Sequence, residues 1–334
     1  MLGAPDLAVK ILIAGGGGGV GASVAFNLLI GPGDHEVTLV DRRPEMAASH
    51  VLDLEQVLEQ GACGSICQGT DEDVAEAEIV VVSAAAPLTV NQSRMVYLDA
   101  NAQILASVLD HLPHDWGGVL VVVTNPVDPL CTWVARRTGF DGRRVLGYTL
   151  NDSLRLRTAI GHVLELAPGR IDAWMIGEHG NLAVALFDRV TVDGVPVTLS
   201  DEQCARARDF VENWYVRHVA LDSGRSSTWT SGLGVARMVR AIAKPTGVDS
   251  VAESTGVDSG RSVEPQIRED EVWPASVLLQ GEYGLQDVSL SVPVSLGPGG
   301  AERIHEWELT GEQTAQLAVA AEFVVKAAAG IDVT

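Results

Sequence analysis

The stretch "VKILIAGGGGGVGASVAFNLL", residues 9–29, joins an apolar run to a segment of helical period through five consecutive glycines. The first part is typical of a buried strand and the last part of a helix. Gly16, Gly18 and Gly21 fit the pattern G-x-G-x-x-G. Glycine permits a tight turn there and lets a pyrophosphate approach the backbone at the helix N-terminus. The stretch therefore predicts the strand–turn–helix unit of a dinucleotide-binding sheet.

An acidic residue supports this interpretation over that of a merely flexible turn. Asp41 lies 20 residues after Gly21, at the end of the next predicted strand, "HEVTLVD". A carboxylate at this place binds the ribose hydroxyls of an adenosine and repels a 2′-phosphate, so we expect NAD rather than NADP. Arg42 and Arg43 follow directly and soften that preference.

Strands and helices alternate through the first half of the chain. After "HEVTLVD" come the strand patterns "AEIVVVSAA" and "GGVLVVVTNP", separated by helical segments. This order predicts an α/β protein with a Rossmann-type, doubly wound parallel sheet over residues 1–150. Longer helices, among them residues 201–221, then mix with alternating strands, which predicts an α+β substrate domain over 151–334. Residues 245–270 are polar and contain "TGVDS" twice, which indicates an exposed excursion.

Composition excludes several classes of partner. The 334 residues include 44 acidic and 23 Lys or Arg side chains, giving a net charge of −21, which argues against nucleic acid or an anionic membrane as partner. The apolar runs are shorter than a membrane span and the N-terminus lacks a signal-peptide pattern, so we expect a cytoplasmic protein. The four cysteines form one C-x-x-x-C pair without a second pair or a nearby histidine, so we expect buried thiols and no metal site.

A second group of residues carries acid–base chemistry. "GEHG", residues 177–180, places His179 beside glycines after an apolar stretch, and we expect an imidazole left largely uncovered. "YTLNDSLRLR" puts Asp152 and Arg155 three residues apart, on one helix face. The planar fork of Arg155 suits a substrate carboxylate, and Asp152 can fix the tautomer of an imidazole. Taken alone, His179 also fits a satisfied histidine at a strand end.

These motifs together resemble the lactate/malate dehydrogenase family over nearly the whole chain. Besides "GGGGVG" and Asp41, the motifs that carry the resemblance are "VLDL", "VTNPVDPL", "NDSLRLR", "GEHG" and "LQGEYGLQDVSLSVPVSLGPGG". The resemblance implies an NAD-dependent oxidoreductase that acts on a small 2-hydroxy or 2-oxo acid. It also implies a homodimer or homotetramer.

The resemblance assigns roles position by position. It implies that His179 donates and accepts the proton, that Asp152 orients His179, that Arg155 clamps the substrate carboxylate and that Arg94 polarises the reacting carbonyl. The remaining cofactor contacts that it implies are Gly16, Gly18, Gly19, Val20, Gly21, Asp41, Asn101, Val123 and Asn125. The remaining substrate contacts that it implies are Asn125, Leu88 and Ser227.

One loop departs from the family pattern. A segment usually close to "PRKPGMTR" reads "PLTVNQSR" here, so Leu88 stands where malate-type enzymes have arginine and lactate-type enzymes have glutamine. Burying a carboxylate against leucine costs several kcal/mol, so we expect an apolar or specialised substrate side chain. Two alternatives remain. One is a malate dehydrogenase proper with a remodelled loop, in which Asn91 or Gln92 reaches the substrate, and the other is a non-catalytic NAD-binding protein.

Overall fold

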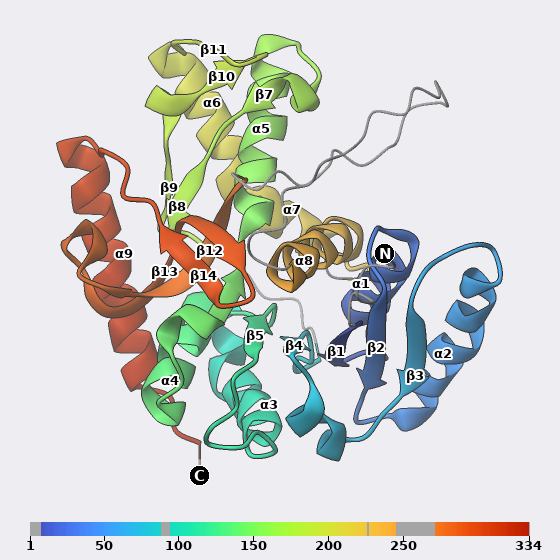
Figure 1. Cartoon of the computed structure of the whole chain (residues 1–334). Coiled ribbons are helices and arrows are strands. Elements are labelled where there is room, and N and C mark those ends of the chain that lie inside the picture. The colour runs from blue at the N-terminus through green and yellow to red at the C-terminus, as the bar shows by residue number, and fades with distance from the viewer. Residues whose placement is uncertain (1–7, 88–93, 226, 245–270, 334) are drawn as a thin grey trace, which may run out of the picture.

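The computed structural model describes residues 8–87, 94–225, 227–244 and 271–333, with Arg94 placed only by its backbone (Figure 1). Leu88 and the predicted excursion at 245–270 lie outside the described residues. No helix within these ranges is long and apolar enough to cross a membrane.

Eleven strands of the described residues form one sheet, in the spatial order β3-β2-β1-β4-β5-β6-β12-β13-β8-β9, with β14 paired to β13. The first six strands are parallel. They are β1 (Val9–Ala14), β2 (His35–Val40), β3 (Ser65–Gln68), β4 (Ile79–Val82), β5 (Val119–Val122) and β6 (Val145–Tyr148). The order reverses between β1 and β4, where a doubly wound sheet binds its ligand. The predicted fold class is confirmed.

Helices cover both faces of the parallel strands, which explains why these strands are apolar throughout. Along β1, Ile11 and Ile13 belong to a core with α1, α2 and α8, whereas Leu12 and Ala14 belong to a core with α3 and α4. The helices are α1 (Gly19–Ile30), α2 (Pro44–Leu58), α3 (Leu98–Leu109), α4 (Val127–Thr138) and α8 (Thr228–Ala243).

The second half of the chain extends the same sheet with antiparallel strands. Strand β12 (Val272–Gln280) pairs antiparallel with β6, and β13 (Gln286–Gly297) pairs with β12 (Figure 1). The sheet then continues through β8 (Met175–Gly177) and β9 (Ala183–Ala185), with β14 (Gly300–Ile304) beside β13. Strands β7 (Ile171–Asp172), β10 (Thr191–Val192) and β11 (Val195–Pro196) form a small separate sheet. Helices α5 (Leu150–Leu164) and α9 (Gly311–Ala329) pack around this half.

The helical pattern predicted over residues 201–221 is two helices rather than one. Helix α6 (Asp201–Glu212) ends at Asn213, and α7 (Trp214–Ala220) begins directly after it. The side-chain amide of Asn213 donates to the Asp209 carbonyl at 3.0 Å and to its carboxylate at 2.9 Å. Asparagine competes in this way with regular helix bonding, and the chain bends there.

The cysteines are only partly as expected. Cys131 is buried, but Cys63 and Cys67 are exposed, and Cys204 is half-buried. Cys67 belongs to β3, the edge strand of the sheet, whose outward face is solvent-exposed. The expectation of buried thiols is therefore wrong for Cys63 and Cys67.

The turn between β1 and α1 requires glycine for steric reasons. Gly15 has φ +90°, and a Cβ there would lie 2.3 Å from the Ala84 backbone nitrogen. A Cβ on Gly21 would lie 2.3 Å from the Gly15 carbonyl oxygen. The close approach of helix, turn and β4 leaves no room for a side chain at either position.

We predict that Gly21→Ala lowers the free energy of unfolding by about 1–3 kcal/mol, the usual cost of overpacking. Urea unfolding measures this change. The matched control is Gly19→Ala, whose Cβ would meet Thr228 at an ordinary 3.5 Å. Equal stability of the two variants would show that the turn relaxes without cost.

Candidate active site

The predicted phosphate-binding turn presents an uncapped helix end. No described side chain caps α1 at Gly18, so its first backbone N–H groups are available to an anion. Asp41, at the end of β2, accepts a hydrogen bond from the Gly17 amide at 3.1 Å and another from the Arg43 amide at 3.0 Å. A helix N-terminus next to a carboxylate fits the phosphates and the adenosine ribose of a dinucleotide.

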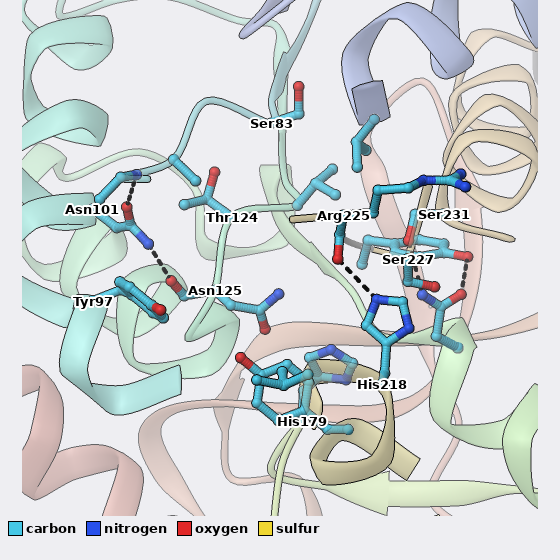
Figure 2. Close-up of a pocket in the computed structure, with 18 of the residues that line it drawn as sticks. Ser83, Tyr97, Asn101, Thr124, Asn125, His179, His218, Arg225, Ser227 and Ser231 are labelled. Carbon is cyan, nitrogen blue, oxygen red and sulfur yellow. Dashed lines mark hydrogen bonds between the residues drawn. The ribbon is translucent and has the colours of Figure 1, made fainter. Parts of the chain in front are cut away.

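A first cavity, of about 230 Å³, lies at the carboxyl ends of β4 and β5 and is closed by α7 and α8 (Figure 2). Its wall includes six residues that the sequence singled out, namely Val20, Asn101, Val123, Asn125, His179 and Ser227. Asn101 fixes one side, because its amide donates to the Asn125 carbonyl at 2.6 Å and accepts from the Ala86 amide at 2.7 Å. The sequence-predicted residues from both halves of the chain therefore meet in one cavity.

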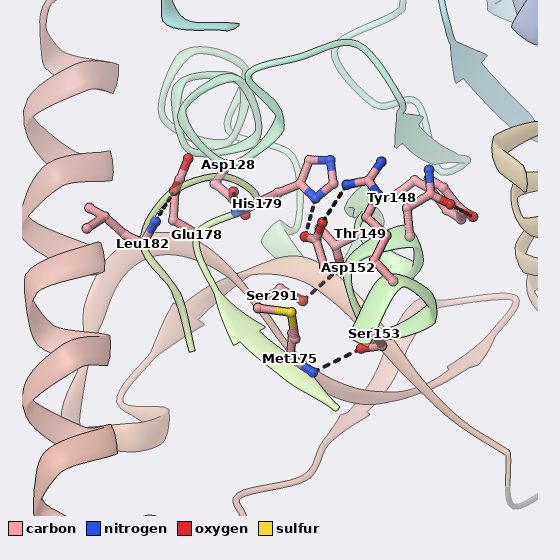
Figure 3. A network of polar contacts seen from close by, with 12 residues as sticks. Asp128, Tyr148, Thr149, Asp152, Ser153, Met175, Glu178, His179, Leu182 and Ser291 are labelled. Atoms are coloured by element: carbon pink, nitrogen blue, oxygen red, sulfur yellow. Dashed lines mark hydrogen bonds and ion pairs between the residues drawn. The ribbon is translucent and has the colours of Figure 1, made fainter. Parts of the chain in front are cut away.

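The Asp152 carboxylate joins two other residues predicted to carry the chemistry, His179 and Arg155 (Figure 3). Asp152 Oδ2 is hydrogen-bonded to His179 Nδ1, and Asp152 Oδ1 accepts from Arg155 Nη1 at 3.0 Å. Asp152 and Arg155 are 13% and 12% exposed, so this ion pair is largely shielded from water. The imidazole is thereby oriented by a group that also holds the guanidinium.

His179 is less exposed than the neighbouring glycines suggest. Its side chain is only 5% exposed, which corrects the expectation of an uncovered imidazole. The ring is bonded to Asp152, and it lines both the first cavity and a second one. Access to His179 is therefore through these cavities.

Two hydrogen bonds fix α5, which carries Asp152 and Arg155, against the extended sheet (Figure 3). The Met175 amide of β8 donates to Ser153 Oγ at 3.0 Å, and Thr149 Oγ1 is 2.8 Å from Ser291 Oγ of β13. These contacts set the distance between α5 and the turn that carries His179.

The second cavity, of about 450 Å³, lies on the substrate-domain side of His179, and Asp152 and Arg155 also line it. His179 and Tyr215 belong to the walls of both cavities. Among the described residues, its large apolar side chains are Met95, Leu156, Met175, Leu182, Val211 and Phe323, and its arginines are Arg155 and Arg208. Met95 follows Arg94 in the short helix Arg94–Tyr97, so the chain that carries Arg94 borders this cavity.

Sequence reasoning missed a buried carboxylate behind His179. Asp128, in the first turn of α4, accepts the backbone N–H of His179 at 2.6 Å. Burial, and then the nearby charge of Glu178, raises the pKa of Asp128 well above its usual range. Glu178 in turn accepts the Leu182 amide at 2.9 Å, so the two acids hold the turn around His179. An Asp inside the apolar run "VDPLCTWV" was the available signal.

A second missed network lies under the first cavity. Tyr148 donates to Asn151 Oδ1 at 2.9 Å, and the Asn151 amide donates to Ser231 Oγ at 2.9 Å. Burial raises the pKa of Tyr148, so its hydroxyl stays a donor. The network links β6, α5 and α8 beside Ser227.

We predict that Asp128→Asn stabilises the fold increasingly as the pH rises. The folded state holds the Asp128 proton more tightly than the unfolded state, so the wild-type free energy of unfolding falls as the pH rises above about 3.9 toward the raised pKa. The asparagine has no such proton, and its carbonyl still accepts the His179 amide. Urea unfolding between pH 4 and pH 8 should show the difference between variant and wild type growing by about 1–3 kcal/mol.

The control is Asp115→Asn, because Asp115 is exposed. If the free energy of unfolding of Asp128→Asn differs from that of the wild type by the same amount at every pH in this range, the assignment of a raised pKa is contradicted.

Both halves of the chain are similar to known proteins. The model of the lactate/malate dehydrogenase NAD-binding domain matches residues 9–147, and that of the lactate/malate dehydrogenase α/β C-terminal domain matches residues 149–328. Malate dehydrogenase of Halobacterium salinarum is 32% identical over 318 residues, which cover 94% of this chain and 96% of that protein. L-lactate dehydrogenase of Corynebacterium glutamicum is 28% identical over 313 residues, covering 91% and 92%.

A solved structure, the malate dehydrogenase of Aeropyrum pernix, superposes with a TM-score of 0.82 at 27% identity, covering 96% of this chain and 98% of that one. Relatives named for malate and for lactate match at similar identity, so the comparisons do not select the acid. They do confirm the predicted family, fold and cofactor. The chain belongs to the lactate/malate dehydrogenase family and is an NAD-dependent 2-hydroxy acid dehydrogenase.

Proposed function

We propose that this dehydrogenase interconverts a 2-oxo acid with an apolar side chain and the corresponding 2-hydroxy acid. Residues 1–150 bind NAD(H), and residues 151–334 bind the acid. The observation that carries the proposal is the Asp152 carboxylate bonded to both His179 and Arg155 at the junction of two cavities. The change from parallel to antiparallel pairing after β6 supports the division near residue 150.

When bound, NADH supplies the hydride that reduces the C2 carbonyl carbon. Protonated His179 donates its Nε2 proton to the carbonyl oxygen, since Nδ1 is bonded to Asp152. Asp152 stabilises the imidazolium and keeps the ring oriented, and the reverse reaction returns the proton to His179. The step is balanced, because the carbonyl carbon gains the hydride and the carbonyl oxygen gains the proton.

Arg155 binds the substrate carboxylate through N–H groups other than the one held by Asp152. Arg94 polarises the reacting carbonyl, and Asn125 and Ser227 line the substrate's side of the first cavity. The cofactor lies along Gly16, Gly18, Gly19, Val20 and Gly21, with its ribose on Asp41 and its reactive end near Asn101, Val123 and Asn125.

Leu88 and the walls of the second cavity support a substrate with an apolar side chain. Leucine cannot pair with a distal carboxylate, and the cavity beside His179 and Arg155 has mainly apolar walls. Arg208 favours a second candidate, a malate dehydrogenase with a remodelled loop, because it is a cation on the same wall. The two candidates differ in which side chain the enzyme prefers.

We also propose that the protein forms a homodimer or a homotetramer. Phe26 and Ile30 on α1 and Trp229 and Leu233 on α8 are exposed, and these two helices pack against each other. Adjacent exposed apolar side chains of this size are typical of a subunit interface.

We predict that His179→Asn lowers kcat by about 10²–10⁴-fold, the usual contribution of general acid–base catalysis. NADH binding, measured by fluorescence titration, should stay near the wild-type value, because His179 lies away from the adenosine site. His114→Asn is the control, since His114 is exposed and lines neither cavity. Retained turnover in His179→Asn would remove this residue from the mechanism.

We predict that kcat/KM is higher for 2-oxo acids with bulky apolar side chains than for oxaloacetate. Leu88→Arg should move the ratio toward oxaloacetate by about ten- to hundredfold, the worth of one charge-assisted bidentate contact. NADH oxidation with a panel of 2-oxo acids measures the ratio, and Leu88→Met is the control of similar volume.

Oxaloacetate as the best wild-type substrate, with that activity lost in Arg208→Ala, would establish the malate alternative instead. Binding of NADH without turnover of any acid in the panel would establish the non-catalytic alternative.

A further inference from the structure

Arg155 is held by an aromatic ring as well as by Asp152. The centre of its guanidinium lies 4.0 Å from the centroid of the Trp214 ring, which is close for a cation–π contact. Asp152 is on α5, the same helix as Arg155, whereas Trp214 is the first residue of α7. Two elements therefore converge on one guanidinium.

The position of Trp214 is itself fixed. The break at Asn213 separates α7 from α6, and the Arg217 guanidinium donates back to the Phe210 carbonyl at 2.6 Å. The His218 ring stacks on Trp214 with centroids 5.0 Å apart and planes 10° apart. His218 Nε2 donates to the Arg225 carbonyl at 2.9 Å, which ties α7 to the segment before α8 (Figure 2).

A carboxylate clamp depends on the plane of the guanidinium, because two parallel N–H···O bonds form only when the two planar groups are nearly coplanar. The hydrogen bond from Arg155 Nη1 to Asp152 fixes one corner of the fork. The Trp214 ring, 4.0 Å from the guanidinium carbon, limits how far the group can turn about that corner. Trp214 is thus placed to orient the edge of Arg155 that faces the substrate.

We propose that Trp214 is a positioning residue, which aligns Arg155 for bidentate binding of the substrate carboxylate. This inference rests on the proposed role of Arg155 as the clamp. It assigns Trp214 no contact with the reacting atoms. Its effect is therefore on carboxylate binding, and it is the same for every 2-oxo acid whatever its side chain.

The test compares Trp214→Leu, which removes the ring, with Trp214→Phe, which keeps an aromatic face. Trp214→Leu should raise KM for each 2-oxo acid by about five- to thirtyfold, the worth of a partly buried cation–π contact, with a smaller change in kcat. The Kd of oxamate, an unreactive carboxylate analogue of a 2-oxo acid, should rise by the same factor in the NADH complex. Trp214→Phe should recover most of both losses.

A double-mutant cycle separates positioning from other effects. In an Arg155→Leu background, Trp214→Leu should cause no further loss of oxamate binding. Oxamate binding is measured at saturating NADH, because Trp214 also lines the first cavity. Trp133→Leu is the matched control, because Trp133 also lies under an arginine, Arg137, but lines neither cavity.

Three results would overturn the proposal. One is a rise in the oxamate Kd on Trp214→Leu that is as large in the Arg155→Leu background as in the wild type. The others are a rise in KM that varies with the substrate side chain, and a fall in kcat with KM unchanged. If the wild-type enzyme turns over 2-oxo acids and Trp214→Leu changes neither KM nor the oxamate Kd, the positioning role of Trp214 is refuted and the proposed function is left intact. A wild type that binds oxamate without turning over any acid would refute the function, and the oxamate data would still decide the role of Trp214.

Discussion

The active site depends on the two oxygens of Asp152. One oxygen is bonded to the His179 imidazole and the other to the Arg155 guanidinium, so a single carboxylate sets the relative positions of the proposed proton donor and the proposed substrate clamp. With little water around it, this charge acts strongly on both partners. Neutralising or moving Asp152 would therefore disturb proton transfer and substrate binding together.

The rest of the fold serves to hold this carboxylate and its partners in place. Helix α5 starts two residues after β6 ends, at the point where the sheet changes from parallel to antiparallel pairing. Ser153 and Thr149 bond to β8 and β13, and Asp128 holds the backbone of His179 from α4. The two halves of the chain thus share one sheet, and the catalytic groups lie along their junction. Such rigid support is what a preorganised site requires.

The second cavity extends from the Asp152 network into the second half of the chain. It is lined by α5, α6, the β8–β9 hairpin and α9, together with the chain after Arg94, and its walls are mainly apolar. Helix α7 borders both cavities, because Tyr215 lines both, and Trp214 lines the first cavity and contacts Arg155. A family that keeps its proton donor and clamp can therefore change its acid by changing these walls.

The sequence by itself determined the doubly wound parallel sheet of the nucleotide-binding half, the glycine turn, the place of Asp41 after a strand, and the grouping of Asp152 and Arg155. These features follow from short spacings, namely strand and helix periods, a turn that only glycine fits, and two residues on one helix face. The sequence also suggested His179, but it predicted an open imidazole where the structure has a nearly buried one.

Only the tertiary structure decided the contacts of Asp128 and Trp214 and the second cavity. The contacts that define them join residues far apart in the chain, such as Asp128 with His179 and Arg155 with Trp214. No local period encodes such a pair, because the distance between its members is set by how helices pack on a sheet.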